Sequence, residues 1–484
     1  MSNSSNNYDY DVIVIGAGPA GYVAAIRAAQ LGFKTASIDN WTNAQGEHKL
    51  GGAYVNSGCV ACIALLESAK IHHLLRHNLA QHGLAVDNLR IDITQMLARK
   101  NAITQQVSQQ INDLFTAHQV TCITGRGKLL NAKQVEVSNL TPSTEKQVLS
   151  AKYIILASGS SSIMPDWAKI DHQFILDSTH ALNMPEIPKE LGILGAGVIG
   201  LELASIWNRL GTKVTLLEAQ NHFLPILDHE IAKNAQQMYI DQGLDIRLGA
   251  RVLAAKAENQ GVTVDYQDQQ GKHSVRFDKF IVASGRKPNT ANLAAAEAQL
   301  LLDENGFVHV DEQCGTNLPG VYAIGDLTLL GPMLTHKGIE EGIFVAEHMA
   351  AQHGAINYAM ISNIIYTDPE IAWIGHTEQA LKAVGEPIKT SLFPLHANAK
   401  AQAMDKTHGI VKLISHAETD KILGVHIIAE HASELIAEAV LAMEFSASTE
   451  DLARTIHAHP TFSTALHEAA LALNSRAIHV PNKR

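Results

Sequence analysis

This chain of 484 residues has few cysteines, fewer basic than acidic residues, and no long apolar run. Its four cysteines are far too few for a disulfide-stapled scaffold, whereas an apolar content of 46% can supply several ordinary globular cores. The net charge of −11 excludes the basic surface that nucleic-acid binding requires. We therefore expect a globular protein of several domains that does not bind nucleic acid.

Membrane and export signals are also missing. No uninterrupted apolar run reaches the roughly 18 residues that a membrane-spanning helix needs, so we expect no membrane segment. Residues 1–7 are rich in Ser and Asn and lack the basic start and apolar stretch of a signal peptide, which predicts a terminal tail. These features indicate a soluble cytoplasmic protein, a setting in which disulfides are usually catalytic.

Two of the cysteines stand three residues apart. Cys59 and Cys62 follow a glycine-rich stretch, and an apolar run continues from Cys62, which predicts a helix with both thiols on one face of its first turn. Amide dipoles at a helix start favour the thiolate, the reactive form of cysteine. The C-x-x-C spacing alone is compatible with a redox pair, half of a metal site or two core thiols. Of the others, Cys122 is expected in the core, and Cys314, in a polar segment, carries no visible chemistry.

A dinucleotide-binding fingerprint lies near the N-terminus. A strand over residues 11–15 runs into a G-x-G-x-x-G motif, a helix over residues 22–31 follows, and a second strand over residues 34–38 ends at Asp39. The motif consists of Gly16, Gly18 and Gly21. Such glycines allow the tight turn, the approach of the pyrophosphate and close helix–strand packing, and the acid accepts hydrogen bonds from ribose hydroxyls.

The same pattern occurs a second time in the middle of the chain. A strand over residues 191–194, a helix over residues 201–210 and a strand over residues 213–217 that ends at Glu218 surround its glycines. The glycines are Gly195, Gly197 and Gly200. An acid at the end of the second strand favours NAD over NADP, since it would repel a 2′-phosphate. Two such sites in one chain suggest a flavin and a nicotinamide that exchange a hydride.

Three further segments end a predicted buried strand at a glycine, where the backbone passes near a ligand. They cover residues 153–159, 280–286 and 321–326. From about residue 358 the pattern changes to antiparallel strands and polar loops, with an amphipathic helix over residues 432–445. We expect a separate α+β module there.

Taken together, these motifs resemble the dihydrolipoamide dehydrogenase branch of the pyridine nucleotide-disulfide oxidoreductases. The resemblance runs from residue 9 to about residue 475 and includes residues 50–52, 56, 58–59, 325–326, 333–337, 366–370 and 457–461. It implies an α/β fold of two Rossmann-like domains and a C-terminal α+β dimerisation domain in a homodimer. The implied domains are FAD-binding (8–160 and 288–356), an inserted NAD-binding domain (161–287) and dimerisation (357–484).

The resemblance also implies the cofactors FAD and NAD and assigns residues to them. The FAD residues would be Gly16, Gly18, Gly21, Asp39, Gly52, Gly127, Ser158, Gly159, Gly325, Asp326, Met333, Leu334 and His336. The NAD residues would be Gly195, Gly197, Gly200, Glu202, Glu218 and Gly285. In the family, hydride passes from NADH to FAD, the flavin reduces an adjacent disulfide, and a histidine–glutamate pair of the other subunit assists exchange with the substrate.

The chain departs from the family pattern where the chemistry lies. Tyr54 stands where the family has its outer, substrate-attacking cysteine, and Ile63 stands where the family has the lysine beside the flavin. The serine of the motif is Cys62. His459 matches the catalytic histidine, but Thr464 replaces the glutamate that orients it, which predicts a weaker base. In the family, that lysine pairs with a carboxylate that matches Glu202. With Ile63 in its place, the Glu202 carboxylate should be solvated, find another partner or have a raised pKa.

Three hypotheses stay open from the sequence. In the first, Cys59 and Cys62 form a displaced redox pair, since i and i+3 on a helix lie within the roughly 7 Å between Cα atoms that a disulfide needs. In the second, Cys59 alone cycles through sulfenic acid and reduces a peroxide or a small disulfide. In the third, the flavoprotein has lost disulfide chemistry and serves as a diaphorase or an interaction partner. A zinc site is disfavoured because no second ligand pair lies nearby.

Overall fold

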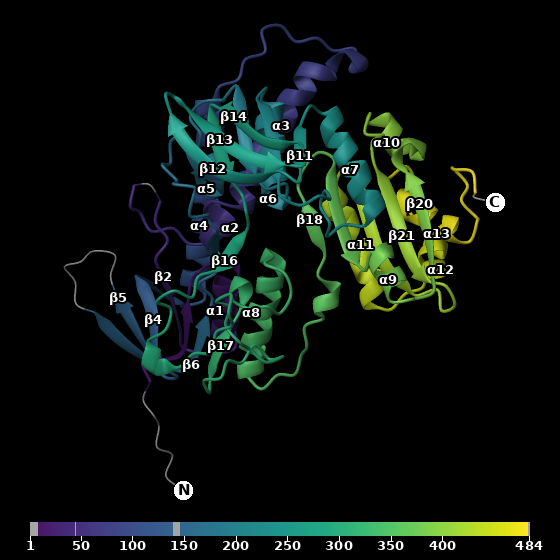
Figure 1. Cartoon of the computed structure of the whole chain (residues 1–484). Coiled ribbons are helices and arrows are strands. Elements are labelled where there is room, and N and C mark those ends of the chain that lie inside the picture. The colour runs from purple at the N-terminus through teal and green to yellow at the C-terminus, as the bar shows by residue number, and fades with distance from the viewer. Residues whose placement is uncertain (1–7, 44, 139–145, 483–484) are drawn as a thin grey trace. The chain divides into compact units, whose positions relative to one another are not determined.

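The computed structural model describes residues 8–43, 45–138 and 146–482, which divide into two compact units (Figure 1). The first unit comprises Met1–Ala64, Thr94–Ile163 and Gly285–Tyr358, and the second Leu65–Ile93, Met164–Ser284 and Ala359–Arg484. The tail expected over residues 1–7 lies outside the described residues. The domain boundaries given above stay a prediction.

A seven-stranded sheet forms the centre of the first unit. Its order is β3-β2-β1-β6-β5-β4, and β17 pairs with β6. The strands are β1 (Tyr10–Ile15), β2 (Thr35–Asp39), β3 (Thr121–Thr124), β4 (Arg126–Asn131), β5 (Gln134–Ser138), β6 (Gln147–Leu156) and β17 (Val321–Ala323). β1 is parallel to both of its neighbours and its central residues are fully buried, which explains its uninterrupted apolar sequence. The short strands β7 (Ser160–Ser162) and β16 (Arg286–Pro288) pair separately.

Two helices that begin at ligand-binding motifs pack against each other in this unit. They are α1 (Pro19–Gln30) and α8 (Thr335–Met349), side by side in Figure 1. The contact is close because a Cβ on Gly342 would lie 2.6 Å from the carbonyl oxygen of Ala20. The other helices of the unit are α2 (Gly52–Asn56), α4 (Ile93–Ala117) and the 3-10 turns η2 (Ala296–Ala298) and η3 (Gly325–Leu327). Helix α3 (Cys59–His77) begins in the first unit and continues into the second.

The second unit contains a parallel sheet with the order β11-β10-β9-β15-β8. Its strands are β8 (Ile175–Asp177), β9 (Glu190–Leu194), β10 (Lys213–Glu218), β11 (Asp245–Leu248) and β15 (Lys279–Val282), with helices α5 (Ser178–Ala181), α6 (Val198–Arg209) and α7 (His229–Asp241). An antiparallel sheet of β12 (Arg251–Glu258), β13 (Gly261–Asp268) and β14 (Gly271–Phe277) accompanies it. The 3-10 turn η1 (Leu79–His82) follows α3.

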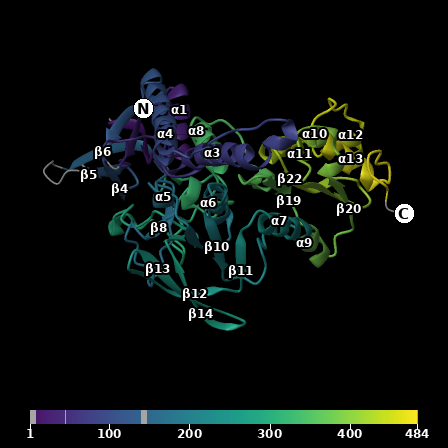
Figure 2. The ribbon, with the colours of Figure 1, turned by 90° about the horizontal axis from the view of Figure 1, so that it is seen from above.

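An antiparallel sheet with the order β18-β19-β22-β21-β20 forms the C-terminal part of this unit, as predicted. Its elements are β18 (Asn363–Ile365), β19 (Glu370–Gly375), α9 (Glu378–Ala383), β20 (Ile388–Pro394), α10 (Ala399–Ala403), β21 (Ile410–His416), β22 (Ile422–Ala429), α11 (Ala432–Glu444), α12 (Thr449–Arg454) and α13 (Thr464–Leu473), with the turns η4 (Tyr358–Met360) and η5 (Leu395–Ala397). Figure 2 shows α11 and α13 on one side of the sheet and α7 and α9 on the other. Apolar residues of β21 and β22 form the core under α11 and α13.

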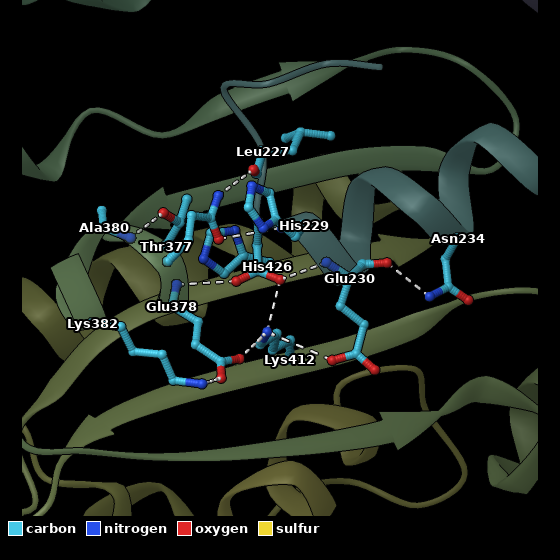
Figure 3. A network of polar contacts seen from close by, with 12 residues as sticks. Leu227, His229, Glu230, Asn234, Thr377, Glu378, Ala380, Lys382, Lys412 and His426 are labelled. Carbon is cyan, nitrogen blue, oxygen red and sulfur yellow. Dashed lines mark hydrogen bonds and ion pairs between the residues drawn. The ribbon is translucent and has the colours of Figure 1, made fainter. Parts of the chain in front are cut away.

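The opposite face of this sheet carries a buried ion cluster (Figure 3). Lys412 on β21 lies 2.7 Å from Asp228, which caps α7, and 2.5 Å from Glu378 on α9. His426 on β22 is fully buried, and its Nε2 lies 3.1 Å from the carbonyl oxygen of His376. The cluster thus joins the segment that contains α7 to the C-terminal sheet inside one unit.

The prediction that Cys122 lies in the core was wrong. Cys122 is exposed, because β3 is the edge strand of its sheet and its side chain lies outside the core. Cys314 is fully buried, with its Sγ 3.8 Å from the hydroxyl of Tyr358, and burial raises its pKa to about 12, so it remains an inert thiol. The polar residues around Cys314 form a turn in which Asp311 accepts the backbone N–H groups of Gln313 and Gly315.

By length and composition, one helical stretch of the described chain, Gly52–His77, could cross a membrane. It joins α2 and α3, and the core helix of a globular protein passes the same test. No uninterrupted apolar run was found in it because Lys70 and the histidines of its second half break the pattern.

Candidate functional site

The first glycine motif, Gly16, Gly18 and Gly21, forms a tight turn (here called the first cradle) in which Gly16 and Gly21 leave no room for a side chain. Gly16 has φ +109°, and a Cβ there would lie 2.3 Å from the carbonyl oxygen of Ala157; on Gly21 it would lie 2.0 Å from the carbonyl oxygen of Gly16. Helix α1 begins directly after Gly18, and no side chain caps it. Its N-terminal amides are therefore available to a phosphate, which fits a dinucleotide.

Asp39, at the end of β2, completes this cradle. Its Oδ2 accepts the backbone N–H of Ala17 at 2.8 Å, and its Oδ1 accepts that of Trp41 at 2.9 Å and lies 3.2 Å from Nε2 of His48. The carboxylate is buried, and these donors fix its direction. Oδ2 keeps a second lone pair with which it can accept a ribose hydroxyl.

The remaining residues assigned to FAD lie in the same unit. A Cβ on Gly52 would lie 2.8 Å from the Cα of Gly18, so the two backbones pass each other closely. Around Gly159, which has φ +69°, a Cβ would meet nothing within 4 Å, and Ser158 is bonded to the backbone of Asn289 at 2.9 Å. Gly127 faces Ile15 inside the sheet, a packing contact. Met333, Leu334 and His336 surround the start of α8 and are partly buried.

A buried ion pair supports the loop that carries Asp326. Lys337 and Glu341, fully buried on α8, lie 3.1 Å apart. Glu341 Oε2 accepts the N–H of Gly325 at 2.6 Å, and Lys337 donates to the carbonyl oxygen of the same glycine at 2.7 Å. Asp326 itself accepts a hydrogen bond from Ser160. This pair was not among the predicted site residues, although the i,i+4 spacing of its charges on a predicted helix is a readable signal.

The second glycine motif repeats the geometry of the first in the other unit. Gly195 has φ +96°, and a Cβ there would lie 2.5 Å from the carbonyl oxygen of Ala283; on Gly200 it would lie 2.0 Å from the oxygen of Gly195. Helix α6 begins directly after Gly197, again without a side-chain cap. Glu218 accepts the N–H of Ala196 at 2.9 Å, as Asp39 does in the first motif. The residues fit NAD. Gly285 belongs to the other unit, and its contact with NAD stays a prediction.

The two neighbouring thiols lie in the first turn of α3, as predicted. Cys59 is the first residue of the helix, and the N–H of Cys62 donates to the carbonyl oxygen of Gly58 at 2.8 Å. Cys59 is half-buried and Cys62 is 5% exposed, and both are thiols. The Sγ of Cys59 lies 4.0 Å from Oγ1 of Thr335, the first residue of α8. Cys59 thus lies near two helix N-termini, which favour negative charge on sulfur.

The residues that depart from the family pattern have found other contacts. Burial raises the pKa of Tyr54, and the nearby Cys59 raises it further, so its phenol stays protonated beside that thiol. Ile63 is 42% exposed. Glu202 accepts the backbone N–H of Tyr366 at 3.0 Å, so it is paired anew. Thr464 is buried and accepts a hydrogen bond from Nδ2 of Asn398 at 2.9 Å.

His459 is exposed at the turn before α13. His457, two residues earlier, is firmly bonded: its Nε2 lies 2.6 Å from Glu438 and its Nδ1 2.8 Å from the carbonyl oxygen of Thr455. The ring of His459 lies beside the ring of His479, with centroids 6.1 Å apart. Thr464 thus leaves His459 without the carboxylate that the resemblance led us to look for.

Comparison with known proteins decides the family. A family model described as pyridine nucleotide-disulphide oxidoreductase matches residues 10–342, and the model of the dimerisation domain of that family matches residues 361–470. The chain belongs to this family. A dihydrolipoyl dehydrogenase of Cupriavidus necator is 44% identical over 97% of this chain and 99% of its own, and the mitochondrial dihydrolipoyl dehydrogenase of Pisum sativum is 40% identical over 99% and 94%. The crystal structure of LpdA from Mycobacterium tuberculosis has a TM-score of 0.87 at 27% identity, over 96% of this chain and 99% of the other.

These findings confirm several expectations. The oxidoreductase has the α/β fold of the family, with dinucleotide-binding and dimerisation parts, and it is an FAD- and NAD-dependent enzyme. The glycine cradles described above are consistent with that chemistry. The departures from the family pattern, at Tyr54, Ile63 and Thr464, concern the transfer of electrons from the flavin to its acceptor.

Proposed function

We propose that the enzyme passes electrons from NADH through FAD to a disulfide between Cys59 and Cys62. FAD, when bound, accepts the hydride and supplies two electrons. The Cys59–Cys62 disulfide takes up two electrons and two protons and becomes two thiols, which then reduce a disulfide substrate and are oxidised again. The dihydrolipoyl dehydrogenases among the relatives favour a disulfide substrate of the lipoamide class, which becomes the dithiol.

The observation that carries this proposal is the position of the two thiols in one helical turn. Side chains at i and i+3 on a helix are neighbours, roughly 5–6 Å apart at Cβ, which is within reach of a disulfide after a small adjustment. Cys59, the more exposed of the two, would be attacked or attack first. Cys62, buried one turn later, would resolve the mixed disulfide. Tyr54 cannot take this part, because a phenol does not exchange with disulfides.

Anaerobic titration with NADH tests the proposal. A working disulfide raises the uptake from about two electrons per subunit, for the flavin alone, to about four. Cys62→Ser should take up about two, whereas Cys122→Ser, which changes an exposed thiol on β3, should still take up about four. Iodoacetamide mapping should find Cys59 and Cys62 protected before NADH and alkylated after it. If they are never found as a disulfide, the pair plays no redox part.

A second candidate is favoured by the burial of Cys62, which limits the access of bulky disulfides. Cys59 alone would be oxidised by a peroxide to sulfenic acid with release of water, and two electrons from NADH would return it to the thiol. In that case Cys62→Ser keeps NADH-dependent peroxide reduction and Cys59→Ser abolishes it. A third outcome, no change of any activity in Cys59→Ser, leaves a diaphorase or an interaction role.

We further propose that the protein is a cytoplasmic homodimer with His459 of one subunit acting in the site of the other. Support comes from the matched dimerisation domain and from large apolar side chains that the second unit leaves exposed. Among them, Leu441, Phe445, Ile456 and Ile478 lie within the last 44 residues of the chain. Light scattering on Phe445→Asp and Ile456→Asp variants should detect monomers, and Val384→Asp, at an exposed apolar residue after α9, is the control.

A further inference from the structure

The segment that follows α13 holds a buried carboxylate and an imidazole together. Glu468, on α13, is 4% exposed, and its Oε1 lies 2.8 Å from Nδ1 of His479. Its Oε2 accepts the backbone N–H groups of Ile478 and His479 at 3.0 and 3.2 Å. Burial alone would raise the pKa of Glu468, but the hydrogen bonds from His479 and these two amides hold it below its usual value. The carboxylate is therefore charged, and the imidazole is fixed on it.

Two further hydrogen bonds hold the segment after α13 in place. Asn482 accepts the N–H of Ala477 at 2.9 Å and donates to its carbonyl oxygen at 3.0 Å, and Ala477 is buried. Oε2 of Glu468 holds the backbone of the segment through its two amide contacts. The further contact with Nδ1 orients the ring of His479, whose side chain is half-exposed.

The ring so oriented lies beside His459. The two rings are nearly parallel, with an angle of 24° and centroids 6.1 Å apart. His459 has no recorded hydrogen bond among the described residues, and the carboxylate at position 464 that could orient it is absent. A base that takes a proton from a reacting thiol needs a third group to hold it in place.

We propose that His479, held by Glu468, is the positioning residue for His459. The pair compensates for Thr464: the counter-charge comes from Glu468 in the middle of α13 instead of from position 464 at its start, and it acts through a second imidazole. The inference rests on the proposed thiol–disulfide exchange, in which His459 is the base. His479 makes no contact with substrate in this scheme.

Substitution of His479 and Glu468 tests the inference, with lipoamide as the disulfide probe and ferricyanide as an acceptor that needs no histidine. His479→Ala should lower kcat for NADH-dependent lipoamide reduction about tenfold, with KM and the ferricyanide rate nearly unchanged. Glu468→Gln should act in the same direction. His273→Asn, which breaks a His–carboxylate contact of the same 2.8 Å length with Asp268 in β13, should change neither rate. Adding Thr464→Glu to His479→Ala should restore most of the lost rate.

Carbethoxylation by diethylpyrocarbonate, mapped by mass spectrometry, measures the accessibility of the His459 ring without enzyme turnover. Loss of the neighbouring ring in His479→Ala should raise the rate of carbethoxylation of His459 about threefold and leave that of His457 unchanged. An unchanged rate at His459, or a loss of ferricyanide activity as large as that of lipoamide activity, overturns the inference. If the wild type reduces ferricyanide but not lipoamide, the proposed exchange fails, and the carbethoxylation rates still decide whether His479 holds His459.

Discussion

Single glycines decide whether the first cradle can form. At Gly16 both φ (+109°) and the 2.3 Å that would separate a Cβ from the carbonyl oxygen of Ala157 exclude a side chain. Gly32 has a similar φ of +90°, but a Cβ there would meet nothing within 4 Å. The pair therefore separates the cost of a strained backbone from the cost of a clash inside the dinucleotide site.

We expect Gly16→Ala to lose most of its bound FAD and Gly32→Ala to keep it. The backbone strain common to both should cost about 1–2 kcal/mol of unfolding free energy, and the clash should add about 1–3 kcal/mol at Gly16 alone. The ratio of flavin to protein absorbance and the denaturation midpoint measure the two effects. Equal flavin loss in both variants would mean that backbone strain, and not the clash with Ala157, shapes the site.

The hydroxyl of Thr335 lies 4.0 Å from the Sγ of Cys59. Because a hydroxyl near a thiolate stabilises it weakly, Thr335→Val should slow alkylation of Cys59 by iodoacetamide about two- to threefold at neutral pH. Thr335→Ser keeps the hydroxyl and should react at the wild-type rate. Equal rates in all three proteins would assign the reactivity of Cys59 to the helix N-termini alone.

At the scale of elements, the sequence predicted more of the cofactor cradles than of the thiol and histidine sites. Strand, glycine motif, helix and acid are contiguous, so local spacing was enough to predict both Rossmann-like motifs, although α1 and α6 begin three residues earlier than expected because Gly18 and Gly197 serve as N-caps. The Glu468–His479 pair and the amide that binds Thr464 could not be predicted in this way. The contact of Thr464 joins segments 66 residues apart, and that of Glu468 depends on how the chain after α13 folds back onto the helix.

Helix α8 allows the contribution of a buried ion pair to be compared with that of a partly exposed one, since it takes part in both. Lys337→Met leaves Glu341 buried without its cation, which should cost about 3–5 kcal/mol and weaken FAD binding through the loop at Gly325. Arg27→Ala, which removes the partly exposed pair with Glu347 on the same helix, should cost less than about 1 kcal/mol. Denaturation and FAD titration of both variants are the measurements. A similar cost for both pairs would show that burial is not what matters.

On the scale of the whole molecule, the Lys412 cluster makes the second unit sensitive to acid (Figure 3). Burial alone would raise the pKa of Asp228, but Lys412 and the N–H of Glu378 hold it below the usual 3.8. Lys382 and Lys412 lower the pKa of Glu378 below 4.5, and burial lowers that of His426 below 6.5. In each case the unfolded chain binds more protons than the folded one, so stability falls as the pH falls.

The loss should begin below pH 6.5, where His426 becomes charged in the unfolded chain only, and steepen below about pH 4.5 as the two carboxylates begin to protonate in the unfolded chain. Lys412→Met should cost about 3–5 kcal/mol at pH 7, because Asp228 stays buried without its cation. That difference from the wild type should shrink as the pH falls towards 4, because the buried Asp228 of the variant, without its cation, protonates in the folded state and loses the penalty of an unpaired charge. Lys382→Ala, at an exposed partner of Glu378, should change stability little at either pH. A Lys412→Met deficit that is the same at pH 7 and pH 4 would mean that lost packing, and not charge, accounts for it.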